Sequence, residues 1–155
     1  MKQVEARLAL IVAQMRRDWG AVEHMGARAF SVDPAHGAPE AALVAMSLHH
    51  AYQAFESLLE RLSRALGLPL PTGERSHQVL LEEAGIDIPG VRSALVPEEA
   101  RRAWQELLRF RHFFRHAYHV DLEPSELTTN REHLASAIVM TGPRVAAAID
   151  GLVSN

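Results

Sequence analysis

The 155-residue chain contains no cysteine, so a disulfide scaffold and thiolate metal ligands are both excluded. Aromatic residues make up only 6% of the chain, whereas alanine and leucine are abundant, and this balance favours helices over sheets. The sequence also lacks an apolar run that approaches the length of a bilayer, and no secretory signal is recognisable. We therefore expect a soluble, cytoplasmic protein.

Positive charge is not in excess either, because the formal net charge is −3 and the pI is near 6.3. A protein that coats nucleic acid through bulk charge has a strongly basic surface, so this class is disfavoured. Any polyanion would have to be bound by a local patch. The length and the apolar share of 48% fit one domain over residues 1–155 with a substantial core.

Apolar residues recur every three or four positions along most of the chain, which predicts an all-α helical bundle. Glycine and proline divide the pattern into about five helices. The predicted helices cover residues 2 to about 30, about 39–66, 74–83, about 97 to 119–121, and 124–130 to about 151. Gly142-Pro143 is predicted to bend or break the last helix, and residues 86–90 are predicted to form a turn.

The most unusual segment is residues 111–118, which read RHFFRHAY. It holds two arginines, two histidines and a tyrosine within about two helical turns, and no acidic residue lies between Glu106 and Asp121. Arginine binds phosphate through two parallel hydrogen bonds, and histidine exchanges protons near neutral pH. RNA supplies its own nucleophile, the 2′-hydroxyl group. The segment therefore indicates a phosphate-handling site that would need no metal.

On a helix, this segment presents two opposite faces. The polar face carries Arg111, His112, Arg115, His116, Tyr118 and His119. Phe110, Phe113 and Phe114 fill the other face, and we expect them to enter the core. One turn earlier, Trp104 and Leu108 lie on nearly the same line as Arg111.

Trp104 and Leu108 allow two interpretations. In the first, they are exposed beside the cationic cluster and form a homodimer interface with a polar pocket at its edge. In the second, they belong to the core because the helix is central in the bundle.

Arg111, four residues, His116, one residue and Tyr118 form the pattern R-x4-H-x-Y. This pattern resembles the signature of the HEPN superfamily, specifically of HepT-like ribonuclease toxins. Residues 80–85 with the proline-bearing turn after them, and residues 120–123, resemble the layout of the same family. The resemblance therefore spans most of the chain, and the N-terminal helix is its least diagnostic part.

The resemblance implies a small helical bundle that dimerises through the motif-bearing region. It implies that Arg111 and His116 catalyse metal-independent RNA cleavage without a cofactor, supported by Arg115 and His112. It also implies that a partner nucleotidyltransferase of the MntA type attaches AMP to Tyr118 and silences the toxin.

Two details of this site stay open. Many family members have asparagine directly after the arginine, and here His112 either replaces or assists His116. On a straight helix, Arg111 and His116 point about 140° apart. Either the helix unwinds near His116, or the two residues meet across a dimer interface.

His112, His116 and His119 have a spacing that is compatible with zinc. A plain polar face is favoured over a metal site, because no carboxylate is adjacent and the neighbouring arginines would repel a dication.

For Arg111 and Arg115, the simplest alternative to a functional role is a solvated face or a bridge to glutamate on a neighbouring helix. His49 and His50 on the second helix are most often core-edge histidines in such a position. One of them, or Tyr52, could still approach the site.

Two functions fit these observations. The first is an RNA-cleaving toxin that a nucleotidyltransferase antitoxin holds in check. The alternative is a non-catalytic HEPN module that binds a nucleotide and docks a nucleotidyltransferase partner. The low net charge keeps this alternative open, because RNA affinity outside the site would be weak.

Overall fold

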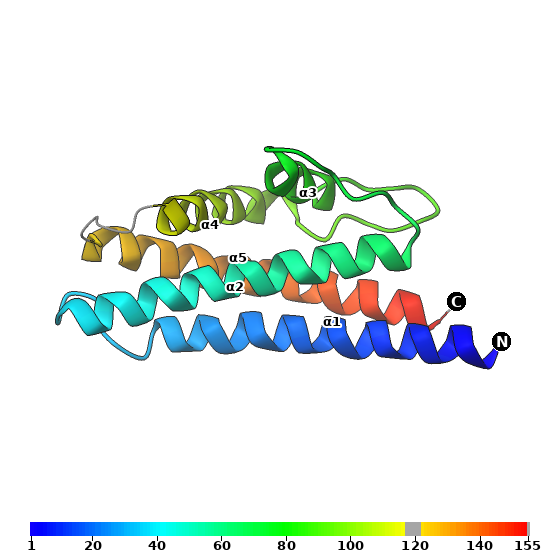
Figure 1. Ribbon diagram of the computed structural model, residues 1–155, viewed down its shortest axis with the longest axis horizontal. Coiled ribbons are helices and arrows are strands. Elements are labelled where there is room, and N and C mark those ends of the chain that lie inside the picture. Colours follow the sequence, from blue (N-terminus) through cyan, green and yellow to red (C-terminus); the bar gives the residue numbers. More distant parts are fainter. Residues whose placement is uncertain (117–121, 155) are drawn as a thin grey trace.

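The computed structural model describes residues 1–116 and 122–154, with His116 described by its backbone alone, and these residues form five α-helices in an elongated bundle (Figure 1). The helices are α1 (Lys2–Ala29), α2 (Ala38–Ala65), α3 (Ser76–Ala84), α4 (Glu98–His116) and α5 (Pro124–Val153). The described residues contain no strand, apart from an isolated antiparallel bridge between Ile88 and Arg92. The prediction of an all-α bundle of about five helices is confirmed.

Neighbouring long helices run antiparallel, α1 against α2 and α4 against α5 (Figure 1). The core lies where α1, α2 and α5 meet, and Met15, Val22, Leu48, Phe55 and Leu134 are almost completely buried there. The short helix α3 and the helix α4 lie over α2, so that α2 contacts every other helix. This central position makes the outer face of α2 the surface onto which α3 and α4 dock.

The helix predicted over about residues 39–66 ends as expected at Ala65, and Gly67 follows it in a defined local geometry. The N–H of Gly67 donates to the Arg64 carbonyl at 3.1 Å, and the N–H of Leu68 donates to the Ser63 carbonyl at 2.9 Å. This pair of bonds is the Schellman motif, which needs a left-handed residue after the helix. Gly67 has a φ of 70°, which glycine adopts without a steric penalty.

Of the bend or break predicted at Gly142-Pro143, the break is wrong, because α5 runs without interruption from Pro124 to Val153, and the bend stays a prediction. Proline removes one helical hydrogen bond, namely the bond to the carbonyl four residues earlier. That carbonyl belongs to Val139, whose side chain is 75% exposed. The missing bond therefore lies toward the solvent side of the helix, where the carbonyl of Val139 can bond to water.

By length and composition alone, α5 is apolar enough to cross a membrane. This result departs from our expectation that no stretch approaches that length. The core helix of a soluble protein can have the same length and composition. Here the buried side of α5 includes Leu134, Ala137, Val145 and Ile149, which belong to the hydrophobic core.

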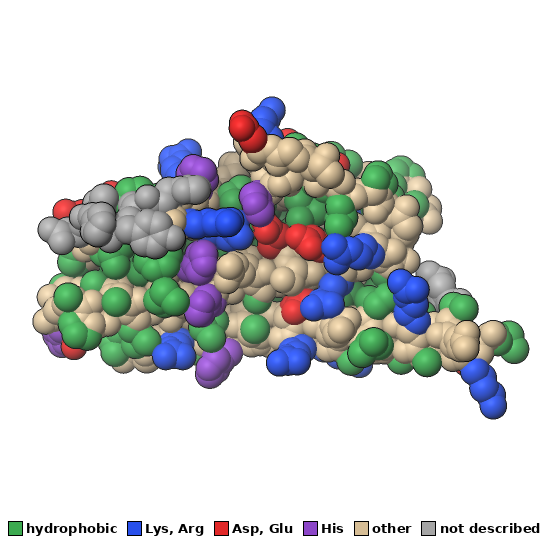
Figure 2. Space-filling view, viewed as in Figure 1, with side chains coloured by type: hydrophobic (Ala, Val, Ile, Leu, Met, Phe, Trp, Pro, Cys, Tyr) green, Lys and Arg blue, Asp and Glu red, His purple; other side chains and the backbone are tan. Residues whose placement is uncertain are grey.

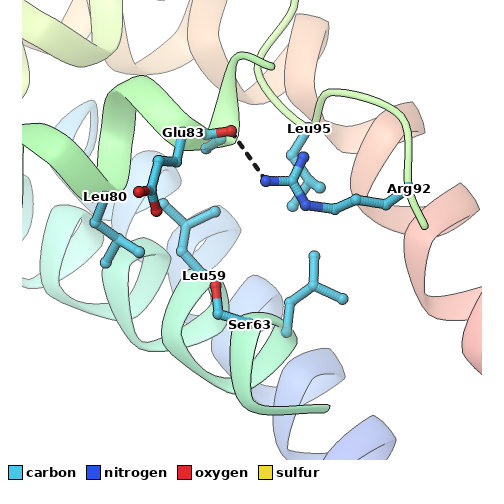
Figure 3. A pocket seen from close by; sticks show the side chains of 8 residues that line it. Leu59, Ser63, Leu80, Glu83, Arg92 and Leu95 are labelled. Carbon is cyan, nitrogen blue, oxygen red and sulfur yellow. Dashed lines mark hydrogen bonds between the residues drawn. The ribbon is translucent and has the colours of Figure 1, made fainter. Parts of the chain in front are cut away.

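The connection from α3 to α4 is held by Arg92 (Figure 3). Its guanidinium donates to the carbonyls of Glu83 and Ile86, each at 2.9 Å, and its backbone pairs with Ile88. The predicted turn at residues 86–90 is thereby confirmed. The cavity beside Arg92 has a volume of about 10 Å³, which is room for about one water molecule. This contact therefore fixes α3 against the bundle and leaves no space for a ligand.

Candidate functional site

Trp104 lies in the core and not at an exposed interface. Its ring stacks on Phe55 with centroids 3.8 Å apart, and its indole N–H donates to Thr141 Oγ1 at 2.9 Å. Trp104 is fully buried, and Leu108 is partly buried against the same core. Of the two interpretations of this apolar pair, the exposed one is wrong and the core one is confirmed, because α4 turns this line of residues toward α2 and α5.

The prediction that Phe110, Phe113 and Phe114 on the opposite face of α4 all enter the core is only partly confirmed. Phe110 is buried as expected, and Phe114 is partly buried and stacks on it with centroids 5.9 Å apart. Phe113, however, is 40% exposed. The helix cannot bury all of its apolar residues. The arc that includes Trp104 and Phe110 packs inward, and Phe113 lies outside this arc.

Arg111 continues the buried line of Trp104 and is only 8% exposed. Its Nη2 lies 3.8 Å from Oε1 of Glu56, and its Cζ lies 5.9 Å from the centroid of the Tyr52 ring. Its Nε is buried and has no hydrogen-bond partner among the described residues. A buried guanidinium with an unused donor is unusual, because buried polar groups are nearly always paired.

Glu56 joins Arg111 to a third helix. The carboxylate is 7% exposed, and both of its oxygens lie 2.8 Å from Nδ1 of His77 on α3. The remainder of the imidazole reaches the surface, since the side chain of His77 is 42% exposed. Neither Glu56 nor His77 was predicted from the sequence as a site residue.

A sequence signal for Glu56 did exist. His49, Tyr52 and Glu56 follow one another at intervals of three and four residues, so they lie on one face of α2. This is a polar stripe on a helix that is otherwise largely apolar. No comparable pattern on the short helix α3 distinguishes His77.

His49 and Tyr52 on α2 lie close to the residues of α4 that carry the predicted site. The sequence had left this approach open as one possibility. The His49 ring lies 5.4 Å from the Phe114 ring, and its buried Nδ1 has no hydrogen-bond partner among the described residues. Burial lowers the pKa of His49, and Arg111, His50 and Arg115 lower it further by repulsion. Its imidazole is therefore neutral at pH 7.

Tyr52 is buried directly below Arg111. Burial raises the pKa of its phenol far above the usual value, and Glu56 raises it further while Arg111 opposes the shift. The Tyr52 hydroxyl therefore stays protonated at any physiological pH.

The remaining predicted residues lie toward the end of α4. Arg115 and His112 are exposed at the surface, and both lie on α4 with the buried Arg111. The helix continues as far as His116, and it does not unwind ahead of that residue. The side chain of His116 is not described, and Tyr118 and His119 lie outside the described residues.

Figure 2 shows histidine, arginine and acidic side chains gathered over the middle of the face of the bundle that it draws. Within the described part of the chain, no group of three or more histidine, aspartate or glutamate side chains could hold a metal ion. A separate open groove of about 560 Å³ lies between α1 and α5 and is lined in part by Trp19 and Pro143. The residues that line this groove do not include Arg111, Glu56, His77, His112 or Arg115.

Comparison with known proteins gives one match. A family model described as HepT-like protein matches residues 43–152, which is more than two thirds of the chain. The matched range includes Glu56, His77 and Arg111, and all of α1 lies outside it. No curated protein and no solved structure matches the chain significantly.

Proposed function

The chain belongs to the HepT-like proteins of the HEPN superfamily, and from this premise we propose that it is the RNA-cleaving toxin of a cytoplasmic toxin–antitoxin pair. The helix α1 lies outside the matched range, but its residues Met15 and Val22 are buried in the common core. All 155 residues therefore form one HepT-like domain in this proposal.

The observation that carries the proposal is the environment of Arg111. Its charge is buried, its contact with Glu56 is long at 3.8 Å, and its Nε donor is unused within the described structure. A guanidinium can donate two parallel hydrogen bonds to the oxygens of a phosphodiester, and in the proposed reaction the side chain of Arg111 moves outward so that its buried Nε becomes accessible. Arg115 and His112 extend the cationic surface next to it.

In the proposed reaction, the RNA 2′-hydroxyl attacks the adjacent phosphorus atom and the P–O5′ bond breaks. The products are a 2′,3′-cyclic phosphate and a free 5′-hydroxyl group. Arg111 binds the phosphate oxygens, on which negative charge increases in the transition state. His116 transfers a proton, and His112 and Arg115 support substrate binding.

This reaction is tested with purified protein and RNA in the presence of EDTA. We expect cleavage with 2′,3′-cyclic phosphate ends, and a loss of about 10²- to 10³-fold in Arg111→Ala and in His116→Ala. His24→Ala, at an exposed histidine on α1, is the matched control and should cleave like the parent. Tight nucleotide binding without turnover of any RNA would instead support the non-catalytic docking module.

We propose that the antitoxin is a nucleotidyltransferase that attaches AMP to Tyr118. Incubation with ATP and a nucleotidyltransferase encoded beside this protein should add AMP units to the intact mass. Tyr118→Phe should abolish the addition, whereas Tyr52→Phe should not, because Tyr52 is buried. Equal addition to the parent and to Tyr118→Phe would contradict the assignment.

We also propose that the protein works as a homodimer in which Arg111 of one copy and His116 of the other act on the same phosphate. The exposed Phe113 on α4 offers an apolar contact for the second copy. A mixture of Arg111→Ala and His116→Ala should then recover roughly a quarter of the parental activity, because half of the dimers are mixed and each has one intact site. No recovery on mixing would place both residues of a site in one chain.

A further inference from the structure

His77 and Glu56 have the geometry of a catalytic histidine held by a carboxylate. Nδ1 of His77 lies 2.8 Å from both oxygens of Glu56, which fixes the plane and the position of the imidazole. Because a carboxylate only accepts hydrogen bonds, Nδ1 must carry the proton in the neutral ring. The lone pair is then on Nε2, as in the histidines that carboxylates orient in hydrolases.

The same carboxylate connects this histidine to the proposed phosphate site. Oε1 of Glu56 lies 2.8 Å from Nδ1 of His77 and 3.8 Å from Nη2 of Arg111. The carboxylate is buried, whereas the side chain of His77 is 42% exposed and accessible to a substrate. Arg111, Glu56 and His77 therefore form one connected group, in which the basic nitrogen of the partly exposed imidazole is not used by Glu56.

We propose that His77 is the general base of the ribonuclease reaction and that Glu56 is its positioning residue, an inference that rests on the proposed function. Nε2 of His77 accepts the proton of the 2′-hydroxyl while that oxygen forms its bond to phosphorus. The P–O5′ bond breaks, and the 5′-oxygen takes a proton from His116 as the general acid. Glu56 stabilises the imidazolium that forms, and Arg111 binds the phosphate oxygens.

This assignment divides the two proton transfers between different histidines, and a modified substrate separates them. In an RNA with sulfur in place of the bridging 5′-oxygen at the cleaved linkage, the leaving group departs without an acid. The sulfur substrate should therefore restore His116→Ala to near the parental rate. It should leave His77→Gln about 10²- to 10⁴-fold slower than the parent, because the 2′-hydroxyl still has to be deprotonated.

A purely structural role of His77 gives a different result. Glutamine at position 77 keeps an N–H donor for Glu56, so the link between α2 and α3 survives and the melting temperature should change little. For His77→Ala, we expect free imidazole to restore cleavage at least tenfold over its own background, which a structural contact would not allow. His24→Ala is the matched control and should neither lose activity nor respond to imidazole.

The tautomer of His77 provides a readout besides activity. Nitrogen chemical shifts of labelled protein should show a protonated Nδ1 and an unprotonated Nε2, and Glu56→Gln should weaken this preference. An Nε2–H tautomer in the parent would overturn the proposal. The proposal would also be overturned if His77→Gln cleaved both substrates at the parental rate while Arg111→Ala stayed inactive. This outcome leaves the proposed ribonuclease function intact. If the parent protein cleaves no RNA, both the proposed ribonuclease function and the role of His77 are wrong.

Discussion

Two buried polar contacts lie two turns apart on the same line of α4, and they differ in how completely they are paired. Trp104 donates its one indole proton to Thr141 at 2.9 Å, and both residues are fully buried. Arg111 lies 3.8 Å from Glu56, and its Nε has no partner among the described residues. The first contact is complete, whereas the second has donor capacity left.

This difference separates a contact that stabilises the fold from one that is available for binding. A completed hydrogen bond in the core contributes to stability and offers nothing to a ligand. An incomplete buried charge destabilises the protein, and such groups are concentrated at functional sites. The same helix therefore begins as a core element and ends as the wall of a site.

The largest expected effect comes from Trp104→Ala, which removes the ring that stacks on Phe55. Replacing a fully buried tryptophan by alanine should lower the free energy of unfolding by about 3–5 kcal/mol. Denaturant titration measures this change. A loss below about 1 kcal/mol would show that the contact with Thr141 does not belong to the stabilising core.

The next effect, in Arg111→Lys, should fall on activity and not on stability. Lysine keeps the positive charge but cannot offer two parallel donors to a phosphate. We expect RNA cleavage to fall about 10²- to 10³-fold, equivalent to about 2.7–4 kcal/mol of transition-state stabilisation. The melting temperature is measured alongside, and a large decrease in it would mean that Arg111 is a structural residue like Trp104.

Thr141→Val should lower the free energy of unfolding by a smaller amount and should leave RNA cleavage unchanged. Valine has nearly the shape of threonine but leaves the Trp104 indole N–H buried without an acceptor, which costs about 1–3 kcal/mol. Cleavage per folded molecule should equal that of the parent. A selective loss of cleavage would show that the two contacts on α4 are coupled.

The smallest effect concerns the pH dependence of stability through His49. Since its pKa is lowered in the folded state, the unfolded chain binds the proton more readily. Its contribution is complete above pH 6.5, the ordinary histidine value, and is lost as the pH falls below it. The free energy of unfolding at pH 7.5 and pH 5.5 should therefore differ less in His49→Gln than in the parent, and an unchanged difference would contradict this assignment.

Most of the fold was predictable because its signals are local. Apolar periodicity defined the helices, and Gly67 marked the end of α2 through its left-handed backbone. The break predicted at Pro143 was wrong because the carbonyl affected by the proline lies toward solvent, which depends on the neighbouring helices and not on the local sequence.

The candidate site was only partly predictable, because it depends on contacts between helices. The segment at residues 111–118 identified Arg111, but α4 has two apolar arcs, and periodicity cannot tell which one packs inward. Glu56, which contacts Arg111, lies on α2 and is 55 residues away in the sequence. His77, which contacts Glu56, lies on α3. Only the polar stripe on α2 gave a hint of Glu56 in advance.

The division of the site among three helices has a consequence during synthesis of the chain. Glu56 and His77 leave the ribosome first, and Arg111 follows only with α4. A growing or prematurely terminated chain that ends before α4 lacks Arg111, the residue that we propose binds the phosphate. If the protein cleaves RNA as proposed, the messenger RNA that is being translated is next to an unfinished protein without the assembled site.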